Sequence, residues 1–202
     1  PQYLIEKYGA DTARLFVIFA SAPEDTLIWN DDGIEGSYRF LNRIWRFSYE
    51  FKNNKNTNAT NLKPTEKMKK YFTDLTVILK QINFDYERLH FNTVASSAMK
   101  IMNLIESKDL QKEENQQVYL FYKYSLNILL KILSPICPHL CFYLWRELDF
   151  GDDIFKSNWP EIQKEFLIRD SYQMVVQING KLRGKMLAPE SLDENKALDL
   201  IK

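Results

Sequence analysis

The chain has 202 residues, 45% of them hydrophobic, which is enough for a globular core in one domain with or without a smaller appendage. Its 27 Lys and Arg residues balance 27 Asp and Glu residues, so the zero net charge excludes a molecule that attracts a polyanion with its whole surface. Any nucleic-acid interface must therefore be a local basic patch. Two cysteines are too few for a disulfide framework.

The sequence shows no signal for a membrane or for export. No run approaches the roughly 18 uncharged apolar residues of a membrane span, since the richest, Leu126 to Leu133, contains Lys131. No charged-then-apolar signal segment starts the chain, so we expect a cytoplasmic protein with no membrane partner. The chain starts at Pro1 without an initiator Met, and residues 192–202 end without a capping signal, so we expect a piece of a longer protein.

Helical spacing of apolar residues begins close to the N-terminus. Residues 4–8 form a helical turn that Gly9 closes. The Asp11 carboxylate can then cap a new helix that runs through Phe19, because it accepts the free N–H groups of a first turn. Residues 21–33, rich in Pro, Asn, Asp and Gly, predict a loop.

A strongly two-faced helix is predicted from about Ile34 to about Phe51. At about 100° per residue, one side is apolar and the other is charged. The apolar side comprises Ile34, Leu41, Ile44, Trp45, Ser48 and Phe51, and the charged side comprises Glu35, Arg39, Arg43, Arg46 and Glu50.

Further amphipathic helices follow a polar connector at residues 52–63. Apolar residues at three-to-four spacing predict helices over about 64–82, 94–105 and 113–133, and a short one after Pro135 and Pro138 through Leu148. No single helix can bury its apolar stripe alone. The pattern therefore predicts a mainly α fold. Residues 1–10 would be a connecting segment, and residues 11–150 would form an antiparallel helical bundle.

Residues 151–202 predict a linker and a small α/β appendage. Residues 172–188 are rich in β-branched residues around Asn179-Gly180, which predicts a β-hairpin. A two-residue loop would mix apolar and charged side chains on both faces, so we favour a three-residue loop that pairs Gln177 with Lys181. Ser191 and Glu194 predict a capping box for a short final helix.

Three arginines on the charged side of the long helix form the first candidate nucleic-acid site. Arg39, Arg43 and Arg46 span about 10 Å of helix, a spacing that reaches successive phosphates, and a guanidinium binds phosphate oxygens in pairs. The alternative is a solvated face on which Glu35–Arg39 and Arg46–Glu50 form i,i+4 ion pairs. Arg43 is the least paired of the three, so it is the strongest phosphate candidate.

A second basic cluster lies in the predicted hairpin and comprises Lys181, Arg183 and Lys185. No carboxylate lies between Asp170 and Glu190 to neutralise it. Phosphate contact and a merely solvated strand face are equally consistent with this pattern.

No metal site and no catalytic residues are predicted. Cys137 and Cys141 lie one helical turn apart with His139 between them, but a structural zinc site needs four ligands and His90 is the only other histidine. We expect the cysteines to be small core residues. The sequence offers no nucleophile–His–carboxylate set and no Gly-rich phosphate loop.

Three strings resemble bacterial leucine–tRNA ligases. Residues 4–46, LIEKYGADTARLFVIFASAPEDTLIWNDDGIEGSYRFLNRIWR, resemble the segment that follows the ATP-binding KMSKS loop of these enzymes. SPICPHLCFYLWREL at residues 134–148 and, after Trp159-Pro160, VVQINGKLRGK at residues 175–185 agree in the same order. The combination of LIWNDDGIEG, RFLNRIWR and INGKLRGK differs from the valine and isoleucine ligases.

The resemblance implies a tRNA-binding bundle of the class Ia synthetase anticodon-binding type with the start of a C-terminal domain. The parent enzyme would attach leucine to its tRNA with ATP and magnesium and edit misacylated tRNA. This chain lacks the HIGH and KMSKS motifs of the family, so we expect it to bind no cofactor and to have no activity of its own. Its implied partners are leucine tRNA and the rest of the synthetase chain, and the chain itself is expected to be a monomer.

The matching motifs also imply roles for the two basic clusters. Arg39, Arg43 and Arg46 become candidates for contact with the tRNA backbone, and Lys181, Arg183 and Lys185 for contact at the outer corner of the tRNA. A rival hypothesis is a helical protein–protein interaction module, which a large exposed apolar patch outside the core would favour. An independent enzyme would need a pocket with converging titratable groups.

Overall fold

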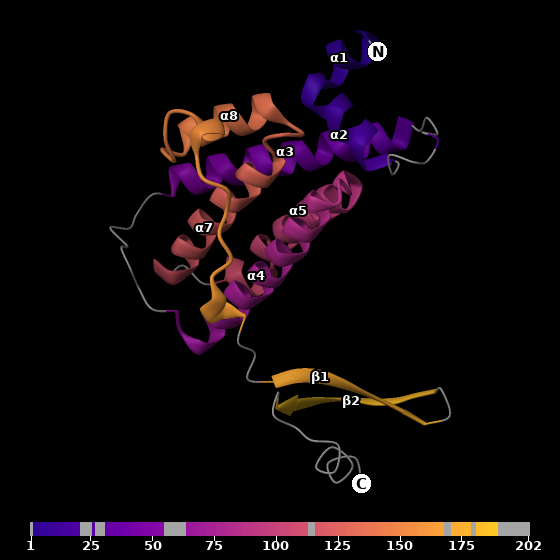
Figure 1. Cartoon of the computed structure of the whole chain (residues 1–202). Helices are drawn as coiled ribbons and strands as arrows, with labels where there is room; N and C mark the ends of the chain where they lie inside the picture. Colours follow the sequence, from indigo (N-terminus) through magenta and orange to yellow (C-terminus); the bar gives the residue numbers. More distant parts are fainter. Residues whose placement is uncertain are drawn as a thin grey trace. The chain divides into compact units, whose positions relative to one another are not determined.

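The computed structural model describes residues 2–20, 26, 31–54, 64–112, 116–167, 171–178 and 181–189. The chain divides into two compact units, residues 1–162 and 163–202. Within the described ranges the first unit holds all the α-helices and the second holds two β-strands, as Figure 1 shows. The predicted mainly helical fold is confirmed. The helices are α1 Gln2–Tyr8, α2 Ala10–Ala20, α3 Asp31–Asn53, α4 Glu66–Glu87, α5 Phe91–Ile105, α6 Lys108–Gln111, α7 Gln116–Leu133 and α8 Pro138–Glu147.

The core of the first unit forms around α7 and α5. The buried residues of α7 recur at nearly every position from Ser125 to Leu133, so this helix is buried around most of its circumference. On α5 the fully buried residues follow helical spacing from Val94 to Ile105. Helices α4 and α5 pack side by side and run in opposite directions, because only residues 88–90 connect them. Each large side chain buried in this way contributes about 1.5–3 kcal/mol.

Helix α3 buries its apolar face as predicted, with one exception that matters for function. Ile34, Leu41, Ile44, Ser48 and Phe51 are all buried. The prediction for Trp45 was wrong, because its side chain is 39% exposed. Two phenylalanines that the wheel did not assign, Phe40 and Phe47, are buried instead, since α3 is contacted by neighbours on more than one side.

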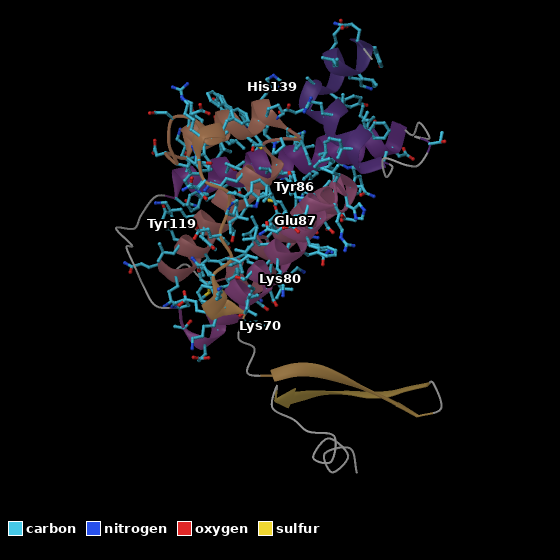
Figure 2. All side chains as sticks on the ribbon, in the orientation of Figure 1. Lys70, Lys80, Tyr86, Glu87, Tyr119 and His139 are labelled. Carbon is cyan, nitrogen blue, oxygen red and sulfur yellow. The ribbon has the colours of Figure 1, made fainter. Side chains whose placement is uncertain are left out.

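Asp11 caps a different helix from the one predicted. It lies within α2, and its Oδ2 accepts a hydrogen bond of 2.7 Å from the backbone N–H of Leu140, in the first turn of α8. Its Oδ1 lies 2.8 Å from Nδ1 of His139, so both carboxylate oxygens are used by α8. Figure 2 labels His139 on α8. An N-cap contributed from another helix in this way was not visible in local sequence.

Arg14 adds a second tie between α2 and the start of α8. Its Nε donates to the carbonyl of Ile136 at 2.8 Å, and its Nη2 donates to the carbonyl of Pro135 at 3.0 Å. These carbonyls lie in the turn between α7 and α8. Asp11 and Arg14 come from the string GADTARLF, and their partners come from SPICPHL, so two of the resembling strings hold the fold together.

The first unit includes a stretch that follows the bundle. Ile154 and Pro160 are buried, and Nε1 of Trp159 donates a 2.9 Å hydrogen bond to Oδ1 of Asn83 on α4. The Trp159 ring also packs edge-on against Tyr86, with ring centroids 4.9 Å apart. The compact unit therefore extends to Ile162, beyond the bundle boundary predicted at residue 150.

In the second unit, β1 (Ser171–Ile178) pairs antiparallel with β2 (Lys181–Pro189). The predicted pairing of Gln177 with Lys181 was wrong, because Ile178 is opposite Lys181. A bulge between Val176 and Gln177 then shifts the register, which sets Met174 opposite Met186. A bulge, and not the predicted three-residue loop, therefore places these two apolar residues opposite each other. The predicted final helix lies outside the described residues.

No helix within the described residues is long and apolar enough to cross a membrane.

Candidate nucleic-acid interface

Helix α3 presents Arg39 and Arg46 to solvent on its outer face. Their side chains are 70% and 69% exposed. Arg39 Nη1 lies 3.9 Å from Oε2 of Glu35, and Arg46 Nε lies 3.8 Å from Oε1 of Glu50, each one helical turn away. The two predicted i,i+4 ion pairs are therefore present in the structure.

These two ion pairs are weak enough to exchange for a ligand. Exposed i,i+4 pairs at such distances contribute only about 0.3–0.5 kcal/mol and are screened by salt. A phosphate group that accepts two parallel hydrogen bonds from one guanidinium binds it more strongly than either of these exposed pairs does. Arg39 and Arg46 remain available as cations about 10 Å apart along the helix axis.

Arg43 is the tightest-paired arginine of the three, so the prediction that it is the least paired was wrong. Its Nη2 donates to Oε2 of Glu106 at 2.6 Å and to Oδ1 of Asn103 at 2.9 Å, and its Nε lies 3.2 Å from the same Glu106 oxygen. Its side chain is only 35% exposed. The partners belong to the end of α5 and the residue after it, about sixty positions away, so spacing on α3 could not reveal them. Arg43 fastens α3 to α5.

A hollow of about 390 Å³ lies beside this arginine row. It is lined by residues of α2, α3 and α5, among them Gly33, Gly36 and Ser37 on the first turns of α3. The two glycines carry no side chain, so a ligand can approach the α3 backbone next to Arg39. Among the described residues that line the hollow, there is no set of converging acids and bases of the kind that catalysis needs.

An aromatic row runs along α3 next to the arginines, and the sequence analysis missed it. Tyr38 and Trp45 are 40% and 39% exposed, and each directly precedes one of the exposed arginines. Tyr49 follows one turn after Trp45, and Tyr143 of α8 stacks against Trp45. The repeated aromatic–arginine dipeptide, Tyr38-Arg39 and Trp45-Arg46, is the signal that could have revealed this row.

The basic cluster of the hairpin is placed only by its backbone. Lys181 is opposite Ile178 and Lys185 is opposite Val175, while Arg183 falls at the bulge between them. The bulge interrupts the two-residue alternation on which a single basic face depends. The side chains of Lys181, Arg183 and Lys185 lie outside the described part of the structure.

The cysteine pair is part of the core. Cys137 and Cys141 are fully buried, and burial raises the pKa of both thiols well above the ordinary value. His139 instead contacts Asp11. Among the described residues, no group of three His, Cys, Asp or Glu side chains is placed to hold a metal ion.

A family model for the anticodon-binding domain of tRNA ligases matches residues 69–198, well over half of the chain. The chain belongs to this family. The matched segment of this anticodon-binding domain contains the hairpin cluster, and α3 precedes it.

Curated relatives extend the likeness over nearly the whole anticodon-binding domain and its flanks. A leucine–tRNA ligase of Coxiella burnetii (strain RSA 493 / Nine Mile phase I) is 42% identical over 94% of the chain, and one of Legionella pneumophila (strain Paris) is 39% identical over all of it. The recognised resemblance to leucine–tRNA ligases is therefore confirmed. The chain spans about a quarter of the length of these relatives, 23% and 25% respectively.

A solved structure shares the fold of this anticodon-binding domain. The crystal structure of a ternary complex of Agrobacterium radiobacter K84 agnB2 LeuRS with tRNA and LeuAMS matches with a TM-score of 0.82 and 25% identity. The match covers all of this chain and 26% of that one.

Proposed function

We propose that this anticodon-binding domain docks the sugar–phosphate backbone of leucine tRNA as part of a cytoplasmic leucine–tRNA ligase. The parent enzyme attaches leucine to its tRNA with ATP and magnesium and edits misacylated tRNA. This piece contributes binding and no catalytic residues, and ATP belongs to the rest of the synthetase chain. The piece itself acts as a monomer. Relatives named leucine–tRNA ligases and a structural neighbour solved with tRNA support the assignment.

One observation carries the docking role: Arg39 and Arg46 are exposed, weakly paired and two helical turns apart on α3. Phosphate contacts of this kind set position and affinity without reading sequence. We propose a structural role for Arg43 in place of a phosphate contact, because Glu106 and Asn103 hold its guanidinium. Lys181, Arg183 and Lys185 are proposed as a second contact, at the outer corner of the tRNA, on the strength of their local charge alone.

The test is tRNA binding by the full chain across a series of salt concentrations. Removal of one phosphate-binding side chain should reduce the slope of log K against log salt by about 0.9, so the Arg39→Ala, Arg46→Ala double variant should reduce it by about 2. Lys80→Ala, at an exposed lysine of α4 that Figure 2 labels, is the matched control and should leave the slope unchanged.

Two results would contradict the proposal in different ways. Unchanged affinity in the Lys181→Glu, Arg183→Glu, Lys185→Glu variant would remove the hairpin contact and leave α3 in place. A chain that binds no tRNA even at low salt would remove the docking role itself and favour the protein–protein interaction module.

A further inference from the structure

An aromatic platform joins α3 and α8 beside Arg46. The rings of Trp45 and Tyr143 are stacked, with centroids 5.2 Å apart and planes 14° from parallel. Tyr49 also packs against Trp45, with ring centroids 5.0 Å apart and planes tilted by 32°. The hydroxyl oxygens of Tyr49 and Tyr143 lie 3.2 Å apart, within hydrogen-bond distance. Contacts from two helices thus fix the orientation of all three rings.

This platform remains open to solvent although it is large and apolar. Tyr143 stacks on Trp45 with one face, and its side chain is still 44% exposed. Trp45 is 39% exposed. A flat aromatic surface of this kind binds another flat π system, and a nucleobase that is not stacked in a helix is such a system.

The charges around the platform suit RNA. Arg46 directly follows Trp45 and is 69% exposed, and Arg146, one turn after Tyr143 on α8, is also exposed. The nearest carboxylate on α8, Glu147, is paired with Lys52 at 2.6 Å. The hydrogen bond to Tyr143 raises the pKa of Tyr49 to about 12, so the Tyr49 hydroxyl carries no negative charge at neutral pH. A phosphate can therefore approach from the arginine side while its base reaches the rings.

We propose that Trp45, Tyr49 and Tyr143 form a stacking platform for an unpaired nucleotide of the RNA whose backbone Arg46 contacts. The inference rests on the proposed tRNA docking and names the part of the RNA that is recognised. It requires a base outside a regular helix, such as one in a loop or at a bend. Stacking does not read hydrogen-bond patterns, so the platform accepts any of the bases.

The experiment compares ring-removing and ring-keeping variants of the full chain. Tyr143→Ala removes the outer ring, and Tyr143→Phe keeps the ring while it gives up the hydroxyl interaction with Tyr49. Binding of a tRNA transcript and of a perfect RNA duplex with the same number of phosphates is measured over a salt series. Tyr143→Ala should weaken tRNA binding about tenfold at every salt concentration with an unchanged salt slope, because stacking releases no counterions.

The controls separate stacking from charge and from folding. Tyr143→Phe should bind tRNA within about twofold of the unaltered chain, and duplex RNA should bind all three proteins equally, since stacking needs an exposed base. Arg46→Ala should instead reduce the salt slope by about 0.9. Helical circular dichroism checks the fold. If Tyr143→Ala does not fold, Tyr143→Leu, which fills the same space without an aromatic face, takes its place.

The outcomes distinguish this inference from the docking role. Equal tRNA binding by Tyr143→Ala and Tyr143→Phe, together with a reduced salt slope for Arg46→Ala, overturns the stacking proposal and leaves backbone docking intact. The three rings would then contact another protein segment. Equal weakening on tRNA and duplex also overturns it, because no unpaired base is involved. Absence of tRNA binding by the unaltered chain overturns the docking role and the platform together.

Discussion

Asp11 ties α2 to the start of α8, and its replacement by alanine tests how the first unit is held together. The carboxylate side chain is only 10% exposed and accepts the backbone N–H of Leu140 at 2.7 Å. A hydrogen bond to a charged acceptor contributes about 1.5–3 kcal/mol, and a side-chain N-cap contributes about 1 kcal/mol when measured by alanine substitution. The pair with His139 adds little, because that imidazole is 78% exposed. We expect Asp11→Ala to lower the free energy of unfolding by about 2–3 kcal/mol.

Urea unfolding of the full chain, followed by helical circular dichroism, measures this destabilisation in the first unit, which holds the described α-helices. Asp11→Asn keeps an oxygen acceptor for Leu140 but removes the charge, so it should cost about 1 kcal/mol, the difference between a charged and a neutral hydrogen bond. Asp152→Ala, at an exposed aspartate, is the matched control and should change the stability by less than about 0.5 kcal/mol. If Asp11→Ala were as harmless as Asp152→Ala, the capping role of Asp11 would be refuted.

Two further predictions address the buried thiols and the segment after the bundle. Burial raises the pKa of Cys137 and Cys141, so few thiolates form, and Ellman's reagent at a pH of about 8 should label neither cysteine in the folded chain and both in denaturant. Rapid labelling of the folded chain would show that the thiols are accessible. Trp159→Ala removes the hydrogen bond to Asn83 and the packing on Tyr86, so trypsin should cleave this variant after the exposed Lys156 faster than it cleaves Trp159→Phe, which keeps an aromatic ring. Equal cleavage rates would mean that other contacts, such as those of buried Ile154, hold the segment.

Local sequence was sufficient for the helices and for contacts within one helix. The apolar stripe of α3 predicted its buried face from Ile34 to Phe51, because helical geometry repeats every 3.6 residues. The Glu35–Arg39 and Arg46–Glu50 pairs followed from the same geometry. In these cases both partners lie within about one turn of each other, so their distance is fixed by the backbone and not by the rest of the fold.

Three predictions failed because the deciding partner was distant in sequence. Arg43 was judged the least paired arginine from its neighbours on α3, yet Glu106 beyond α5 neutralises it. Asp11 seemed placed to cap its own helix, yet it caps α8. Trp45 shares the apolar side of the wheel with core residues, yet it lies at the edge of the face that α8 covers and stacks on Tyr143 in partial solvent exposure.

The amino-acid sequence by itself determined the positions of the long helices, most of the residues on their buried faces, and which family the chain resembles, since all three depend on local order and on matching strings. Only the tertiary structure decided which cations are free to meet an anion and which aromatic rings face solvent. Packing brings side chains from α3, α5 and α8 together, and that proximity pairs Arg43, leaves Arg39 and Arg46 exposed and assembles the ring stack.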